Sequence, residues 1–133
     1  MVIAKARIPL KLPSLNDYVK ACRSSPYAGA AMKDRIQRDI GWFLMDLPVI
    51  TGAVIVHFTW TERTKKRDFD NVSFAKKFIL DELVMLGKLE DDSRRYVAGF
   101  TDTFRLGKDW SVDIVIEQER KDDDTEETGT GYN

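Results

Sequence analysis

The sequence predicts an α+β domain in which one small mixed β-sheet carries two helices, in the order β-α-β-α-β-β. The length of 133 residues is that of one compact domain, and the hydrophobic content of 43% is enough to build a core. Segments in which every second residue is apolar are interspersed with segments of helical periodicity. These observations together favour a single sheet covered by helices.

The first half of the chain contains two predicted strands and one predicted helix. Residues 2–8 alternate between apolar and polar and predict a strand, whereas residues 9–29 are rich in turn residues and predict an ordered loop. Apolar residues at helical spacing predict a helix over residues 30–47, which Pro48 ends. Residues 52–60 are β-branched and aromatic, which is typical of a buried strand.

The second half of the chain contains one predicted helix and two predicted strands. The helix covers residues 72–86, and Gly87 follows it in the position where a left-handed backbone commonly ends a helix. Strands at 95–104 and 110–117 come next, joined by the turn sequence RLGKD.

The net charge of −1 averages two regions of different character. Residues 119–133 hold six acidic and two basic side chains without apolar periodicity, which predicts a flexible acidic tail. Residues 1–118, the predicted folded domain, hold 19 basic and 16 acidic side chains and therefore carry a net charge of +3. The sequence shows no signal peptide, no apolar run of membrane-spanning length and only one cysteine, so we expect a cytoplasmic protein without a membrane partner.

Two carboxylates directly behind a run of positive charge form the main candidate site, in the sequence KKRDFDN. If the chain is extended there, Asp68 and Asp70 point to the same side. Capping of the next helix by Asp70 or Asn71 would explain one acid, but not both, nor the later acidic run Glu90-Asp91-Asp92. Paired carboxylates are ligands for hard cations such as Mg²⁺, which activates water and neutralises charge on a phosphate.

The basic residues beside these acids indicate the kind of substrate. Arg63, Lys65, Lys66 and Arg67 precede the acidic pair and are expected to hold a nucleic-acid backbone by charge. A cation between the acids and the phosphates removes the repulsion that bare carboxylates would cause. The pattern therefore favours metal-dependent phosphodiester chemistry on a nucleic acid.

Three motifs in order, DFDN, KKFILDEL and GKLEDD, resemble the signature of the RusA family of Holliday junction resolvases, and the upstream LPSLNDYVKACR is similar to a loop of its phage-type members. The resemblance covers roughly residues 8–117. It implies a RusA-like fold and a Mg²⁺-dependent endonuclease that resolves four-way DNA junctions in recombination and repair. It also suggests phage or prophage origin. Because a four-way junction has two-fold symmetry and needs two paired cuts, we expect a homodimer that presents two sites at once.

The resemblance further implies catalytic and metal-binding acids at Asp68, Asp70 and Asp92. The essential lysine of the family falls on Lys77, which stands four residues before the Asp of the DEL sequence, Asp81.

The lysine assignment departs from the founding pattern of the family, in which the lysine follows the Asn by three positions. Phe74 occupies that position here, so the choice between Lys76 and Lys77 stays open. Lys76 is otherwise expected to contact DNA. The structural alternative for Lys77 is an ion pair with Asp81 at i, i+4.

The distance along the chain makes the third acid a problem. A helix over 72–86 is about 22 Å long, and the return from Gly87 to Asp92 spans roughly 17 Å when fully extended. Asp92 can therefore barely reach Asp68 in the same chain. Three solutions remain open: a helix that begins late, a distorted turn within it, or an Asp92 supplied by a partner protomer.

Two other classes of function remain compatible with the sequence. One is a DNA-junction-binding protein without catalysis, which would use the same basic patch and acids only structurally. Alternatively, the chain could be a Mg²⁺-dependent nucleotide phosphohydrolase, although no Gly-rich phosphate loop is present.

Overall fold

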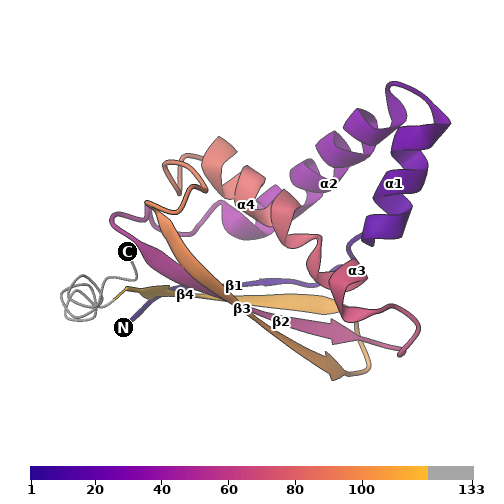
Figure 1. The fold of residues 1–133 in the computed structure, drawn as a ribbon. Helices are drawn as coiled ribbons and strands as arrows, with labels where there is room; N and C mark the ends of the chain where they lie inside the picture. Colours follow the sequence, from indigo (N-terminus) through magenta and orange to yellow (C-terminus); the bar gives the residue numbers. More distant parts are fainter. Residues whose placement is uncertain (120–133) are drawn as a thin grey trace, which may run out of the picture.

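The computed structural model describes residues 1–119, which form a four-stranded sheet with helices on one of its faces (Figure 1). The strands are β1 (Val2–Ile8), β2 (Val54–Glu62), β3 (Val97–Leu106) and β4 (Ser111–Gln118), and the helices are α1 (Leu15–Ser24), α2 (Ala28–Leu44), α3 (Phe69–Ser73) and α4 (Lys76–Met85). The predicted α+β class and mixed sheet are confirmed. The acidic tail expected over 119–133 lies outside the described residues, apart from Glu119.

The sheet has the order β1-β4-β2-β3. Strand β4 pairs antiparallel with both β1 and β2, whereas β3 runs parallel to β2. Parallel neighbours need a crossover connection, and α3 and α4 provide it between β2 and β3. Each strand lies within two residues of its predicted position, because alternation of apolar residues reports directly which face of a strand is buried.

The core lies between the sheet and the helices α2 and α4. Ile40 and Leu44 of α2, Phe78 of α4, and Phe58 and Trp60 of β2 are all buried and belong to one core cluster. The rings of Phe58 and Trp60 stack with centroids 5.4 Å apart. Within residues 1–119, no helix combines the length and the apolar character that crossing a membrane requires.

Helix α1 stands where an ordered loop was expected. Its first turn is fixed by a capping box, in which the Ser14 hydroxyl accepts from the backbone N–H of Asp17 at 3.1 Å and the Asp17 carboxylate accepts from that of Ser14 at 3.0 Å. Tyr18 then packs against Phe74 and Phe78, with ring centroids 5.6 and 5.5 Å away. The predicted element order is therefore wrong at this point, since two helices rather than one separate β1 from β2.

The single helix predicted over 72–86 is divided in two. Helix α3 starts at Phe69, earlier than expected, and Phe74 and Ala75 separate it from α4. The far end agrees with the prediction, because Gly87 has a positive φ of 74° immediately after the C-cap of α4.

The turn between β3 and β4 crosses the end of β2, so the two strands that it joins are not neighbours. The Gly107 N–H donates to the carbonyl of Glu62 at 2.9 Å. A Cβ at Gly107 would lie 2.7 Å from the Thr61 methyl carbon, so only glycine lets the turn pass this closely.

Candidate metal and nucleic-acid site

Asp68 and Asp70 lie at the start of α3, directly after the basic loop that follows β2. Asp68 is the N-cap residue, but its side chain makes no capping hydrogen bond. The Asp70 carboxylate accepts only a local hydrogen bond, from the Asn71 N–H at 3.0 Å. Both side chains are exposed, and neither forms an ion pair with any of residues 1–119. Helix capping by these side chains therefore does not account for this acidic pair, which is accessible to a cation.

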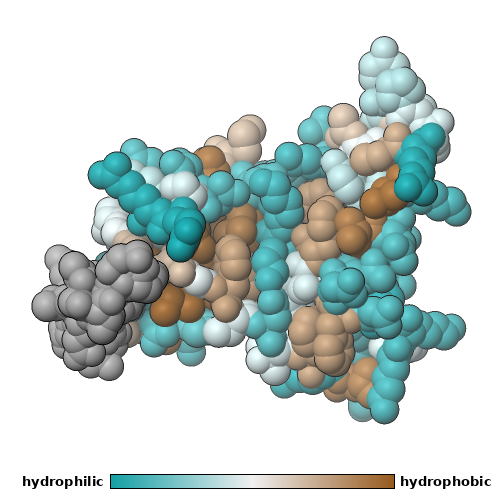
Figure 2. Space-filling model, in the orientation of Figure 1, coloured by the Kyte–Doolittle hydropathy of each residue, from teal (hydrophilic) through white to brown (hydrophobic). Residues whose placement is uncertain are grey.

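A cavity of about 530 Å³ lies beside Asp68. The rings of Phe69 and Phe104 in its wall stack almost in parallel, with centroids 4.1 Å apart, and Phe69 remains 66% exposed. Lys65 and Arg105 also line the cavity. Figure 2 shows apolar surface bordered by hydrophilic side chains at this end of the molecule.

The basic loop after β2 contains side chains without an ion pair among residues 1–119 and one side chain, Arg67, that is held by other residues. Arg63, Lys65 and Lys66 are exposed and form no ion pair within the described part of the chain, so they are available to phosphate. The guanidinium of Arg67 instead donates to both carboxylate oxygens of Glu62, at 2.8 and 2.7 Å, and to the Leu12 carbonyl at 2.7 Å. These contacts give Arg67 a structural role, and the expected contact of Arg67 with DNA stays a prediction.

Lys76 faces the sheet rather than solvent. Its ammonium group lies 2.6 Å from the Asp102 carboxylate and 4.9 Å from the ring centroid of Phe100. The indole N–H of Trp60 donates to the other oxygen of Asp102 at 2.8 Å. Lys76 is therefore held by an ion pair that the sequence did not suggest, and its expected contact with DNA stays a prediction.

Lys77 joins two acids. Its ammonium group lies 3.2 Å from Asp81 and 3.5 Å from Asp92, and the hydrogen bond with Asp81 is the largest of the effects that raise the pKa of Lys77. Asp81 also pairs with Lys33 of α2 at 2.9 Å. Lys77 thus forms the predicted structural ion pair, and it is also the lysine that meets the predicted acid Asp92.

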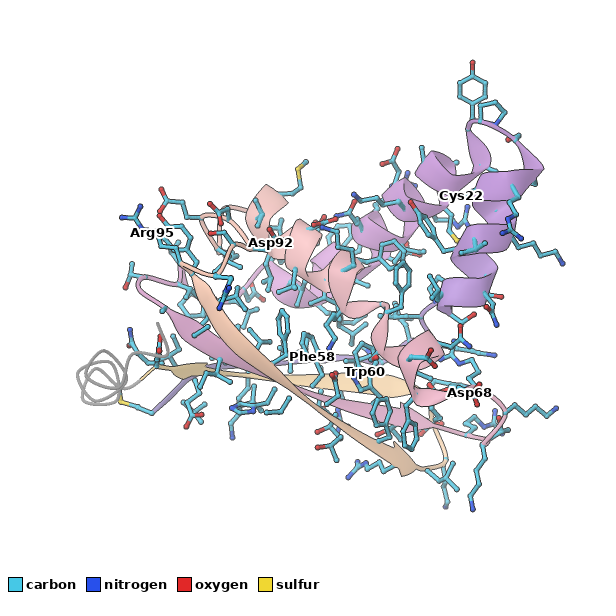
Figure 3. The ribbon with its side chains drawn as sticks, viewed as in Figure 1. Cys22, Phe58, Trp60, Asp68, Asp92 and Arg95 are labelled. Atoms are coloured by element: carbon cyan, nitrogen blue, oxygen red, sulfur yellow. The ribbon has the colours of Figure 1, made fainter. Side chains whose placement is uncertain are left out.

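Asp92 lies in the return loop beside α4, away from Asp68 at the start of α3 (Figure 3). Among residues 1–119, no three His, Cys, Asp or Glu side chains are grouped closely enough to hold a metal ion. The helix does not begin late, and the break at Phe74 does not bring Asp92 to the acidic pair. One chain therefore carries two separate groups, Asp68 with Asp70 and Lys77 with Asp92.

Sequence reasoning overlooked the contribution of β3 to the site. Phe100, Asp102 and Phe104 alternate along this strand and face the helices, where they meet Lys76 and Phe69. The period of two was visible in the sequence, but the parallel pairing with β2 that places this face under α3 was not.

No protein-family model matches this chain, and no curated protein matches it. The functional interpretation therefore depends on the residues, their geometry and the motifs described in the sequence.

Proposed function

We propose that this protein is a Mg²⁺-dependent, structure-selective endonuclease of the RusA type that cuts four-way DNA junctions as a homodimer. The observation that carries the proposal is the exposed Asp68–Asp70 pair, which has no ion-pair partner among residues 1–119 and adjoins a loop of free cations. Exposed carboxylates that no lysine or arginine neutralises are suitable oxygen ligands for Mg²⁺.

The side chains have separate roles in this proposal. Asp68 and Asp70 would hold Mg²⁺, which when bound lowers the pKa of a water molecule and offsets charge on the phosphate. Arg63, Lys65 and Lys66 hold the DNA backbone on the same side of the molecule. Lys77 is our candidate for the lysine whose ammonium group stabilises the negative charge that develops on the leaving oxygen.

We further propose that the active site is shared between two protomers. The separation of Asp92 from Asp68 in one chain supports an arrangement in which Asp92 and Lys77 of one protomer complete the site of the other. Two-fold symmetry makes both sites equivalent. Such a dimer suits a four-way junction, because resolution requires two symmetric cuts.

Cleavage of a fluorescently labelled four-way junction, compared with a linear duplex, tests the activity. The expected result is paired nicks in the junction only, abolished by EDTA and reduced about 100-fold or more by Asp70→Asn, a loss typical of a removed catalytic charge. Asp34→Asn, at an exposed position of α2, changes the charge equally and is expected to leave cleavage unchanged. Cleavage that survives EDTA or Asp70→Asn would contradict the proposed metal site.

Mixing two inactive variants tests the shared site. If Asp92 acts in the partner, a heterodimer of Asp70→Asn and Asp92→Asn chains contains one intact site and one doubly altered site. Random mixing then recovers about a quarter of the wild-type sites, seen as single nicks. If Asp92 acts within its own chain, every site carries one substitution and the mixture stays inactive.

The second candidate is a DNA-junction-binding protein without catalysis, which the absence of a three-acid cluster within residues 1–119 favours. Tight junction binding that is the same with EDTA as with Mg²⁺, Mn²⁺ or Ca²⁺, without cleavage under any of these conditions, would support that alternative.

A further inference from the structure

A second cavity, of about 610 Å³, lies between the segment after β1 and the turn that joins β3 to β4. Four basic side chains and one acidic side chain line it, namely Arg7, Lys11, Arg105, Lys108 and Asp109. Arg7 is neutralised by Asp113, with which it forms two hydrogen bonds of 2.6 and 3.2 Å. The positive charge available to a ligand therefore comes from the other three cations and exceeds the single negative charge of Asp109.

These three cations are not neutralised by ion pairs within the described part of the chain. Lys108 is exposed on the turn. Arg105 uses its Nε–H to donate to the Thr61 hydroxyl at 3.0 Å, and none of its terminal N–H groups has a partner among residues 1–119. Lys11 lies with its ammonium group 4.4 Å from the ring centroid of Trp110.

The turn that carries these groups is fixed in place. Gly107 binds the end of β2 through its N–H and packs against Thr61 so closely that no side chain fits. Trp110 lies between the turn and Arg67, whose guanidinium carbon is 5.5 Å from the ring centroid. A cation on a rigid frame loses less conformational entropy when it binds a phosphate.

The second cavity adjoins the first. Arg105 lines both the cavity beside Asp68 and the cavity at the turn, so cationic surface continues from one to the other. Two adjoining basic cavities suit a polymer of phosphates better than a single small anion. We propose that Arg105 and Lys108 form a second contact surface for the DNA backbone, which holds phosphates next to the segment bound at Asp68 and Asp70. This inference rests on the proposed function for the identity of the polyanion.

Salt-dependent binding measures this contact separately from cleavage. A fluorescently labelled four-way junction is titrated with the full chain in EDTA at several KCl concentrations, and anisotropy gives the binding constant. The slope of log Kobs against log[KCl] is negative, and each phosphate contact adds about 0.9 to its magnitude. Lys108→Gln and Arg105→Gln are each expected to reduce the slope by about 1 and the affinity roughly 5- to 10-fold at 0.1 M KCl. Lys5→Gln, an equal charge change at an exposed site on β1, is expected to alter neither quantity.

The outcomes separate this inference from the proposed function. Junction binding with the same slope in wild type, Lys108→Gln and Arg105→Gln would overturn the second contact surface. Reduced slopes in both variants would support the second contact surface. If the wild-type chain at the same time failed to cleave the junction when Mg²⁺ is restored, the endonuclease would be overturned. A wild-type chain that does not bind the junction would overturn both.

Discussion

Replacing Arg67 by Met tests whether this residue belongs to the fold or to DNA binding. Its side chain is only 15% exposed, and that of its partner Glu62 is 12% exposed. The substitution removes three hydrogen bonds, two to Glu62 and one to the carbonyl of Leu12. It leaves the mostly buried Glu62 carboxylate without a counter-ion.

The expected loss follows from these contacts. Removing one member of a buried ion pair costs about 3–5 kcal/mol, chiefly because the remaining charge is unpaired. Glu62 keeps some contact with water, so we expect the lower end, about 3 kcal/mol. For a domain of this size that is a fall in melting temperature of roughly 10 °C. By contrast, Lys66→Met in the same loop removes an exposed charge and is expected to change the free energy of unfolding by less than about 0.5 kcal/mol.

Urea denaturation followed by circular dichroism measures the effect, with Lys66→Met as the control. A double-mutant cycle with Glu62→Gln then isolates the pair, and we expect the double variant to be less destabilised than the sum of the two single variants. If Arg67→Met were as stable as wild type while DNA binding fell, Arg67 would be a DNA contact and its assignment to the fold would be refuted.

Three further substitutions test other features of the structure. Gly107→Ala is expected to destabilise the fold by about 1–3 kcal/mol in urea denaturation, because its Cβ meets the Thr61 methyl group, and Thr61→Ser should restore most of the loss. Asp17→Ala should cost about 1 kcal/mol at pH 7 by removing half of the capping box. The hydrogen bond from the Ser14 N–H lowers the pKa of Asp17, so its stabilisation is present above about pH 4 and is lost as the pH falls through the folded-state pKa. Denaturation curves of the variant and wild type should therefore converge as the pH falls below that pKa. Asp92→Asn breaks an exposed contact with Lys77 and should change stability by less than about 0.5 kcal/mol while abolishing junction cleavage, whereas a larger loss of stability would indicate a structural role.

The strands could be predicted from the sequence because their burial pattern is local. Val112, Ile114 and Ile116 alternate with polar residues, and this alternation alone places β4 with one face in the core. Helix α1 was missed because Pro13 and its neighbours are typical turn residues. The sequence Ser-Leu-Asn-Asp beginning at Ser14 nevertheless matches the pattern of a capping box, which was the available signal.

The candidate site could be predicted only in part, because spacing in the sequence does not give distance in space. Asp68 and Asp70 lie near each other because only one residue separates them, but the extended backbone that would point both to one side is absent, since α3 begins at Phe69. The contact between Lys77 and Asp92 depends on how the loop after α4 folds back, and the contact of Arg67 with Leu12 joins residues 55 positions apart. Such partners are set by the tertiary arrangement, and no periodicity reports them.

The position of β4 between β1 and β2 determines when this protein can fold during its synthesis. Strand β1 has β4 as its only neighbour in the sheet of residues 1–119, from the pair Val2 and Glu117 to the pair Ile8 and Val112. The ribosome produces β1 first, yet its partner emerges only after residue 111. Until then the backbone N–H and C=O groups of β1 have no strand to pair with, and such an unpaired strand favours aggregation of nascent and prematurely terminated chains. Closing so long a loop also makes folding slow, so protection of the emerging chain by a chaperone should raise the yield of folded protein.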